Sequence, residues 1–132
     1  MNRTSYLVSF LAALLFAGCA SPPTAEEAAR LNVFVSRWDD IRAQKTVPRM
    51  SFARNDLPTP VVQNLGWKEQ RVTMEVIRQD TGKVVYQTSF PLARNETRSA
   101  KPNDPLTAGT YSLKVTPENS PPVVQNFSVY GY

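Results

Sequence analysis

The stretch RVTMEVIRQDTGKVVYQTSF, residues 71–90, decides the fold class. Apolar residues alternate with other residues through 71–78, and this spacing predicts a strand with one face buried. A turn at 79–83 follows, in which Gly82 can supply a positive φ. Residues 84–90 then return as a second β-prone run, so the whole stretch predicts a β-hairpin.

The chain from residue 47 onward has the same texture, with short β-prone runs separated by Pro, Gly, Asn and Asp. We expect a turn and a strand over 106–115, a last strand over 123–130, and a long exposed loop over 94–105. No long helical pattern occurs in this part, which predicts an antiparallel β domain. Trp67, just before the hairpin, could be its buried core aromatic residue.

Residues 24–46 are predicted to form an amphipathic helix. TAEE at 24–27 has the pattern of a capping box. One apolar stripe then follows at helical spacing: Ala28, Leu31, Val35, Trp38 and Ile41. Against this, residues 31–36 alternate like a strand and are rich in β-formers. If the helix forms, Trp38 is either a core residue or an aromatic anchor at a membrane interface.

The leader ends in LFAGC, residues 15–19, which places the single cysteine behind an apolar run and two small residues. Arg3 is the only charge of the leader, and the apolar segment 6–17 is too short to span a bilayer. These features resemble the precursors of bacterial lipoproteins. The resemblance implies that residues 1–18 are a cleaved signal peptide. It also implies that Cys19 carries a diacylglyceryl group and an N-acyl group.

The same resemblance implies a location. In enteric bacteria, an Asp directly after the acylated cysteine looks like an inner-membrane retention signal, and this chain has Ala20 at that position. We therefore expect a lipid anchor in the outer membrane, with the domain facing the periplasm or the surface. Phe16 departs from the Leu usual in this family, which implies slower processing. Residues 19–23 would be a short tether that two prolines stiffen.

AGTYSLKV, residues 108–115, resembles the penultimate strand of immunoglobulin-like or transthyretin-like sandwiches in bacterial envelope proteins. The match rests on Gly109, Thr110 and Tyr111. It implies a Greek-key sandwich whose strands pack face to face. The expected fold is therefore mainly β: a small antiparallel β-sandwich at 47–132, preceded by the amphipathic helix.

One short sequence, PVVQN, occurs twice, at 60–64 and at 122–126. It is followed by an apolar residue both times. The simpler interpretation is two strands that begin alike, because Pro suits a strand start and Val-Val suits a core. The alternative is two equivalent sheet edges to which a partner could add a strand.

The chain offers little for catalysis. It has no histidine, and an acylated Cys19 leaves no thiol, so common proton carriers, nucleophiles and transition-metal ligands are missing. No phosphate-binding or calcium-binding loop occurs, and the formal net charge of +4 is spread without a dense basic patch. We therefore expect no enzyme, no metal, no nucleic-acid partner and no cofactor beyond the acyl groups.

These expectations favour a lipid-anchored accessory subunit that docks to an envelope protein and helps to hold or assemble a complex. The alternative is a ligand-binding lipoprotein, for example one that binds a glycan, or an inhibitor; a small-molecule ligand is not expected. A glycan site could combine Gln63, Asn64, Trp67, Gln125 and Asn126, if the two PVVQN strands are adjacent. The candidate binding residues are Trp38, Trp67, Tyr86, Arg94, Arg98, Lys101, Tyr130 and Tyr132.

Overall fold

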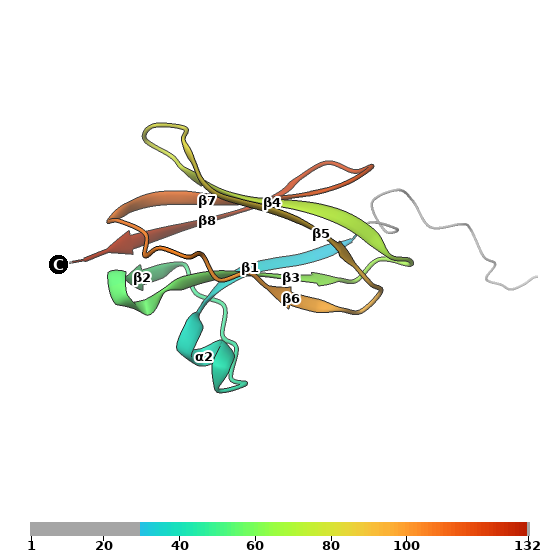
Figure 1. The fold of residues 1–132 in the computed structure, drawn as a ribbon, viewed down its shortest axis with the longest axis horizontal. Coiled ribbons are helices and arrows are strands. Elements are labelled where there is room, and N and C mark those ends of the chain that lie inside the picture. Colours follow the sequence, from blue (N-terminus) through green and yellow to red (C-terminus); the bar gives the residue numbers. More distant parts are fainter. Residues whose placement is uncertain (1–29, 132) are drawn as a thin grey trace, which may run out of the picture.

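The computed structural model describes residues 30–131, which form two β-sheets packed face to face as a β-sandwich (Figure 1). The smaller sheet has the order β1-β3-β6, and its strands are Leu31–Arg37, Pro58–Asn64 and Thr97–Ser99. The larger sheet has the order β2-β8-β7-β4-β5, and its strands are Ser51–Ala53, Val123–Tyr130, Gly109–Pro117, Gln70–Arg78 and Val84–Leu92. Two short helices, α2 (Trp38–Arg42) and η2 (Arg54–Asp56), complete the described elements.

The core lies between the sheets and is built from alternate strand residues. In β4 these are Val72, Met74 and Val76, all fully buried. β7 contributes Tyr111, Leu113 and Val115, of which Val115 pairs with Met74 and Leu113 pairs with Val76. The ring of Phe127 stacks on Tyr111 with centroids 5.5 Å apart and meets Phe52 edge-on at 5.8 Å. The alternation read from the sequence of the hairpin is therefore the inward face of the larger sheet.

The hairpin itself is confirmed. β4 and β5 pair antiparallel along their length, with a register irregularity at Val76/Ile77, and Gly82 has a φ of 72° in the turn. The strands predicted near 111–115 and 123–130 are confirmed as β7 and β8. The expected loop at 94–105 is interrupted by β6, which pairs with β3. The pairing is not wholly antiparallel, because β2 runs parallel to β8.

The helix predicted over 24–46 is wrong where the structure describes it. Residues Leu31–Arg37 are strand β1, and only the five residues of α2 are helical, while residues 24–29 lie outside the described range. All seven residues of β1 pair antiparallel with β3, and Val33 and Val35 are buried. The strand alternation thus prevailed over the helical stripe, because β1 gains both main-chain partners and a buried face.

The two PVVQN segments lie in different sheets, the first in β3 and the second at the start of β8. β3 is the central strand of its sheet, and β8 lies between β2 and β7. The interpretation of both as equivalent edges is therefore wrong.

The two ends of the described chain lie at opposite ends of the sandwich (Figure 1). Leu31 pairs with Asn64 at one end, called here the N-terminal end, while Val129 pairs with Gly109 at the other. Among residues 30–131, no helix has the length and apolar character needed to cross a membrane.

Candidate functional site: two loops at the N-terminal end and an open sheet edge

Asn64 organises the loop between β3 and β4. Its side chain is fully buried, and its amide nitrogen donates to the carbonyl oxygens of Lys68 and Leu92, each at 2.9 Å. Its amide oxygen accepts from the backbone N–H of Gly66 at 2.8 Å and from the side chain of Gln70 at 2.7 Å. Two donors and two acceptor positions are all that an asparagine side chain has, so this residue is fully satisfied and fixes the loop from inside.

The neighbouring loop between β5 and β6 is tied to the same residue. The backbone N–H of Asn64 donates to the carbonyl oxygen of Glu96 at 2.9 Å, and Asn95, at a φ of 67°, donates to the carbonyl oxygen of Asn64 at 2.8 Å. The Glu96 carboxylate accepts from the backbone N–H of Ala93 at 2.8 Å and from Arg98 at 3.1 Å. The Ala93 hydrogen bond, followed by that of Arg98, holds the pKa of Glu96 below its ordinary value.

Trp67 projects outward from this fixed loop. Its side chain is 59% exposed, so the expectation of a core tryptophan is wrong. The core between the sheets is filled by residues of the strands themselves, and the anchors at Asn64 and Gln70 hold the intervening loop at the surface. The guanidinium of Arg94 lies 5.9 Å from the Trp67 ring centroid, at cation–π distance. Two of the predicted binding residues thus meet at the N-terminal end.

The other cations of the predicted loop lie on different aromatic rings. Arg98 stands 4.8 Å from the ring of Phe90, and Lys101 stands 5.7 Å from the ring of Trp38. Trp38 begins α2 and is half-buried, so it is neither a fully buried core residue nor a freely exposed anchor. Arg94, Arg98 and Lys101 therefore do not share a single contact site.

Tyr86 lies at the opposite end of the larger sheet, beside Arg78. The Arg78 guanidinium donates to the Tyr111 hydroxyl at 2.9 Å, to Thr107 Oγ1 at 2.8 Å and to the carbonyl oxygen of Ala108 at 2.9 Å. A hollow of about 270 Å³ lies over Tyr86, Arg78 and Tyr111.

Arg78 also forms an ion pair with Asp80, with Nε and Oδ1 2.8 Å apart. The hydrogen bond to the Asp80 carboxylate raises the pKa of the Arg78 guanidinium. A Cβ at Gly109 would come within 2.7 Å of this guanidinium, which would have to shift away from its partners. The φ of Gly109, 154°, is also one that residues with a side chain rarely adopt. Every observed partner of Arg78 thus belongs to the protein's own fold. Only a charged residue at a strand end hinted at this cluster in the sequence.

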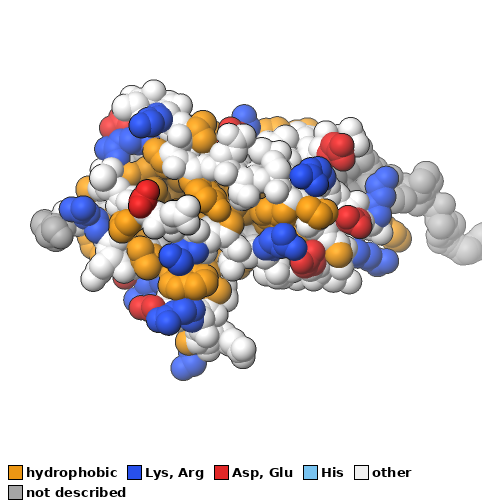
Figure 2. Space-filling view, viewed as in Figure 1, with side chains coloured by type: hydrophobic (Ala, Val, Ile, Leu, Met, Phe, Trp, Pro, Cys, Tyr) orange, Lys and Arg blue, Asp and Glu red, His pale blue; other side chains and the backbone are white. Residues whose placement is uncertain are grey.

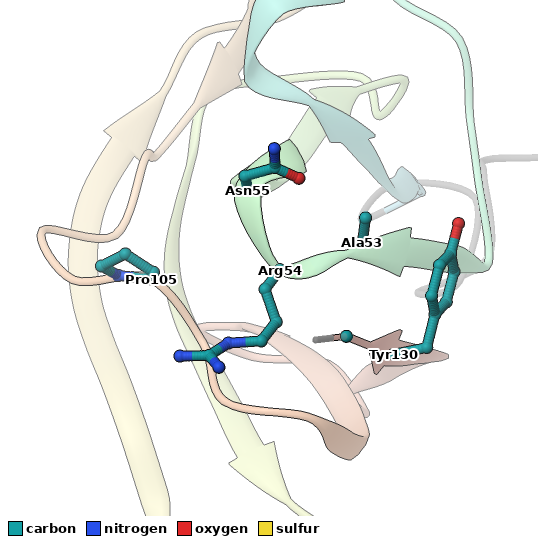
Figure 3. Close-up of a pocket in the computed structure, with 6 residues that line it drawn as sticks. Ala53, Arg54, Asn55, Pro105 and Tyr130 are labelled. Carbon is teal, nitrogen blue, oxygen red and sulfur yellow. The ribbon is translucent and has the colours of Figure 1, made fainter.

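A wider hollow of about 530 Å³ lies at the same end, between Arg54, Asn55, Pro105 and Tyr130 (Figure 3). The Tyr130 ring is exposed and forms one wall. Within residues 30–131, no three His, Cys, Asp or Glu side chains come together as a metal site. Cys19 and Tyr132, the remaining candidates, lie outside the described residues.

The proposed glycan set does not assemble. Gln63 and Asn64 belong to β3, while Gln125 and Asn126 belong to β8 in the other sheet. Asn64 has no free amide atom to offer, because all four of its side-chain positions are used inside the protein. Trp67 remains exposed but without these amide neighbours.

The outer edge of β5 is an open edge of the larger sheet. Its nine residues, VVYQTSFPL, include no charged residue, and Val84 and Val85 are both exposed. Among residues 30–131, the main-chain partners of β5 come from β4 alone, since no other described strand pairs with it. Natural proteins commonly protect such an edge with charges, bulges or proline. β5 has Pro91 near its end and the register irregularity at Val85, opposite Val76/Ile77, but no charge.

Comparison with known proteins gives a fold-level likeness only. No family model matches the chain, and no curated protein matches it significantly. Among solved structures, it is similar to the CARDB domain of the PF1109 protein from Pyrococcus furiosus, described in complex with di-metal ions. The two are 18% identical with a TM-score of 0.47, over 79% of this chain and 90% of that chain.

Proposed function

We propose that this protein is a lipoprotein anchored in the bacterial outer membrane through Cys19, and that it acts without catalysis as an accessory subunit of an envelope complex. The anchor rests on the LFAGC sequence at 15–19. The docking role rests on one observation, the long uncharged open edge of β5.

An extended segment of a partner could add to β5 as the next strand of the larger sheet. Main-chain hydrogen bonds would supply affinity, and exposed side chains on the edge would supply selectivity. Val84 and Val85 stand at the start of this edge, and the half-buried Tyr86 follows them. Short length and lysines on the strand would both disfavour such a partner, and β5 has nine residues and no lysine. Its register irregularity at Val85 and its proline at 91 leave residues 86–90 as the regular part of the edge.

The proposal includes an immunoglobulin-like topology for the sandwich. Support comes from the order β8-β7-β4-β5, which corresponds to G-F-C-C′ in such domains. Further support comes from Tyr111 near the start of β7, whose hydroxyl donates to the carbonyl oxygen of Thr107 at 2.6 Å. This is the hydrogen bond of a tyrosine corner.

The second candidate, a glycan-binding lipoprotein, has the exposed Trp67 in its favour. Aromatic faces suit sugar rings, but the polar partners expected beside it are in the other sheet or buried. We therefore place docking first.

Site-specific photocrosslinking in intact envelopes tests this proposal. A photoreactive residue at Val85 should capture one envelope protein, whereas the same residue at Val124, which is also exposed but lies on β8, should capture none. Val85→Lys should lower the recovery of that protein and Val124→Lys should not. Capture that persists undiminished in a Cys19→Ala form would contradict the need for an anchor. Absence of any adduct at Val85 would refute docking on β5, and enrichment of peptidoglycan or lipopolysaccharide fragments would favour the glycan alternative.

A further inference from the structure

The N-terminal end of the sandwich carries an exposed surface on which apolar and cationic side chains alternate. We name it the Trp67 surface and define it by Arg30, Leu65, Trp67, Lys68 and Arg94. Trp67 and Leu65 are 59% and 40% exposed, and the three cations are exposed as well. Glu69 is the only carboxylate in the two segments 65–69 and 93–95 that carry most of it.

We infer that the Trp67 surface contacts a lipid bilayer, the one that holds the acyl chains of Cys19. This inference rests on the lipid anchor of the proposed function and adds an orientation to it: the sandwich would stand with its N-terminal end on the membrane and its C-terminal end away from it.

The position of the surface is the first argument. The backbone N–H of Leu65 donates to the carbonyl oxygen of Arg30 at 2.9 Å, so the chain reaches the sandwich beside the loop that displays Trp67. Residues 19–29 separate this point from the acylated cysteine, and eleven residues span at most about 40 Å even when fully extended. The Trp67 surface thus includes Arg30, the described residue nearest to the anchor along the chain, and it stays within reach of the bilayer.

The chemistry of the surface is the second argument. Tryptophan prefers the boundary between hydrocarbon and headgroups, because its ring is apolar and its N–H is polar. Lysine and arginine beside it attract anionic headgroups. Figure 2 shows cationic and apolar side chains side by side at the right-hand end of the molecule.

The rigidity of the surface is the third argument. An exposed tryptophan on a mobile loop would lose conformational freedom when it inserts, which opposes binding. Here the buried Asn64 fixes both loops, and Arg94 already stands against the Trp67 ring at 5.9 Å. The surface is therefore preorganised for an interfacial contact and needs no rearrangement before binding.

Tryptophan fluorescence tests this inference, because the chain has two tryptophans, Trp38 and Trp67. Trp38→Phe leaves Trp67 as the only reporter, and Trp67→Phe leaves Trp38 as the matched control. Each lipidated protein is reconstituted into vesicles of phosphatidylethanolamine and phosphatidylglycerol, with and without brominated acyl chains. We expect the Trp67 reporter to shift its emission to shorter wavelength and to be quenched by bromolipid, and the Trp38 reporter to do neither.

A second pair of variants tests the contribution of charge. Lys68→Ala combined with Arg94→Ala should reduce the quenching of the Trp67 reporter. Lys83→Ala combined with Lys114→Ala removes one cation from the β4–β5 turn and one from the middle of β7, and should leave the quenching unchanged.

The outcomes separate this inference from the anchor. Vesicle flotation and the mass of the Cys19 peptide report attachment by themselves. Flotation without quenching at Trp67 would overturn the Trp67 surface as a bilayer contact while leaving the anchor intact. Failure to float would remove the anchor, and with it the ground for this inference. Shielding of Trp67 in intact envelopes but not in vesicles would overturn the inference in favour of a protein partner.

Discussion

PVVQN at 60–64 and PVVQN at 122–126 are the same five residues in two different surroundings. In β3, both valines and Asn64 are buried. In the second segment Val124 is 53% exposed, and Asn126 is exposed with one hydrogen bond to Ser112 at 2.8 Å.

The two segments differ in burial because different strands and loops pack against them. β3 has β1 along its whole length and β6 at its end, and two loops close over Asn64. The start of β8 has β7 on one side, while β2 reaches only Ser128–Tyr130 on the other. Burial of a given residue type is thus decided by the elements that pack on it, and the same short pattern can serve as core or as surface.

The largest expected contrast is between the two asparagines. Asn64→Ala would remove the four side-chain hydrogen bonds that fix the β3–β4 loop and the end of β5, and would leave their amide and carbonyl partners unpaired, while the main-chain hydrogen bonds of residue 64 to the β5–β6 loop remain. We expect a loss of roughly 3–5 kcal/mol in the free energy of unfolding. Asn126→Ala should change it by less than about 0.5 kcal/mol. Urea denaturation of both variants measures the contrast. Equal losses would contradict the assigned role of Asn64.

The valines should show the next contrast. Val62 is fully buried, and Val62→Ala removes two methyl groups and leaves a cavity, for which we expect a loss of about 2 kcal/mol. Val124→Ala at the equivalent place of the second segment should cost less than about 0.5 kcal/mol. The same denaturation curves, with unchanged slopes, check this pair. A larger loss at Val124 would mean that something covers it in solution.

Tyr111 extends the comparison to the opposite end of the sandwich, where a tyrosine hydroxyl, and not an asparagine amide, holds the loop before β7. Its hydroxyl links Thr107 to Arg78, so Tyr111→Phe should cost about 1–2 kcal/mol while the buried ring stays in place. Thermal unfolding is a sufficient measurement. In Tyr111→Phe, amide hydrogen exchange should become faster near 105–109 and stay unchanged near 65–69. Faster exchange at both ends would contradict the independence of the Tyr111 and Asn64 hydrogen-bond clusters.

The smallest expected effect is that of low pH on the free energy of unfolding, through Glu96 in the loop beside Asn64. Because the pKa of Glu96 is lowered in the folded state, its stabilisation is present above the ordinary glutamate pKa of about 4.3 and is lost as the pH falls through the lower folded value. Wild-type stability should therefore decline below about pH 4, and part of that decline should be absent in Glu96→Gln. Asp40, whose pKa is lowered mainly by the hydrogen bond from Arg37, contributes in the same direction, and Asp40→Asn serves as the control far from Asn64.

Four of the five strands of the larger sheet could be predicted from the sequence. β4 and β7 alternate clearly and bury one face, Gly82 marks the turn that leads to β5, and β-prone residues mark β5 and β8. The three residues of β2 are too short a run to be recognised, since only the pairing with β8 defines them. β1 could not be assigned with the same ease, because its apolar residues fit both a helix and a strand, and only the pairing with β3 decides between them.

The candidate site was less predictable. Trp67 and Arg94 are both among the predicted binding residues, although Trp67 was also expected in the core. Their contact could not be predicted, because it joins two loops far apart in sequence. The role of Asn64 was not foreseen, because an asparagine at a strand end usually indicates only a turn. A hint was present in the NLG sequence at 64–66, where a glycine two residues after Asn suits a side chain that accepts from the backbone.

The opposite placement of the two chain ends has a mechanical consequence. A protein held by its first residues and loaded through its last would be stretched along the strands, and β1 would slide against β3 while β8 would slide against β7 and β2. Hydrogen bonds loaded in this direction share the force and must break together, whereas those in a hairpin pulled open from its free ends break one after another. If the protein is anchored as proposed, the sandwich would therefore carry tension applied between its two described ends along the strands.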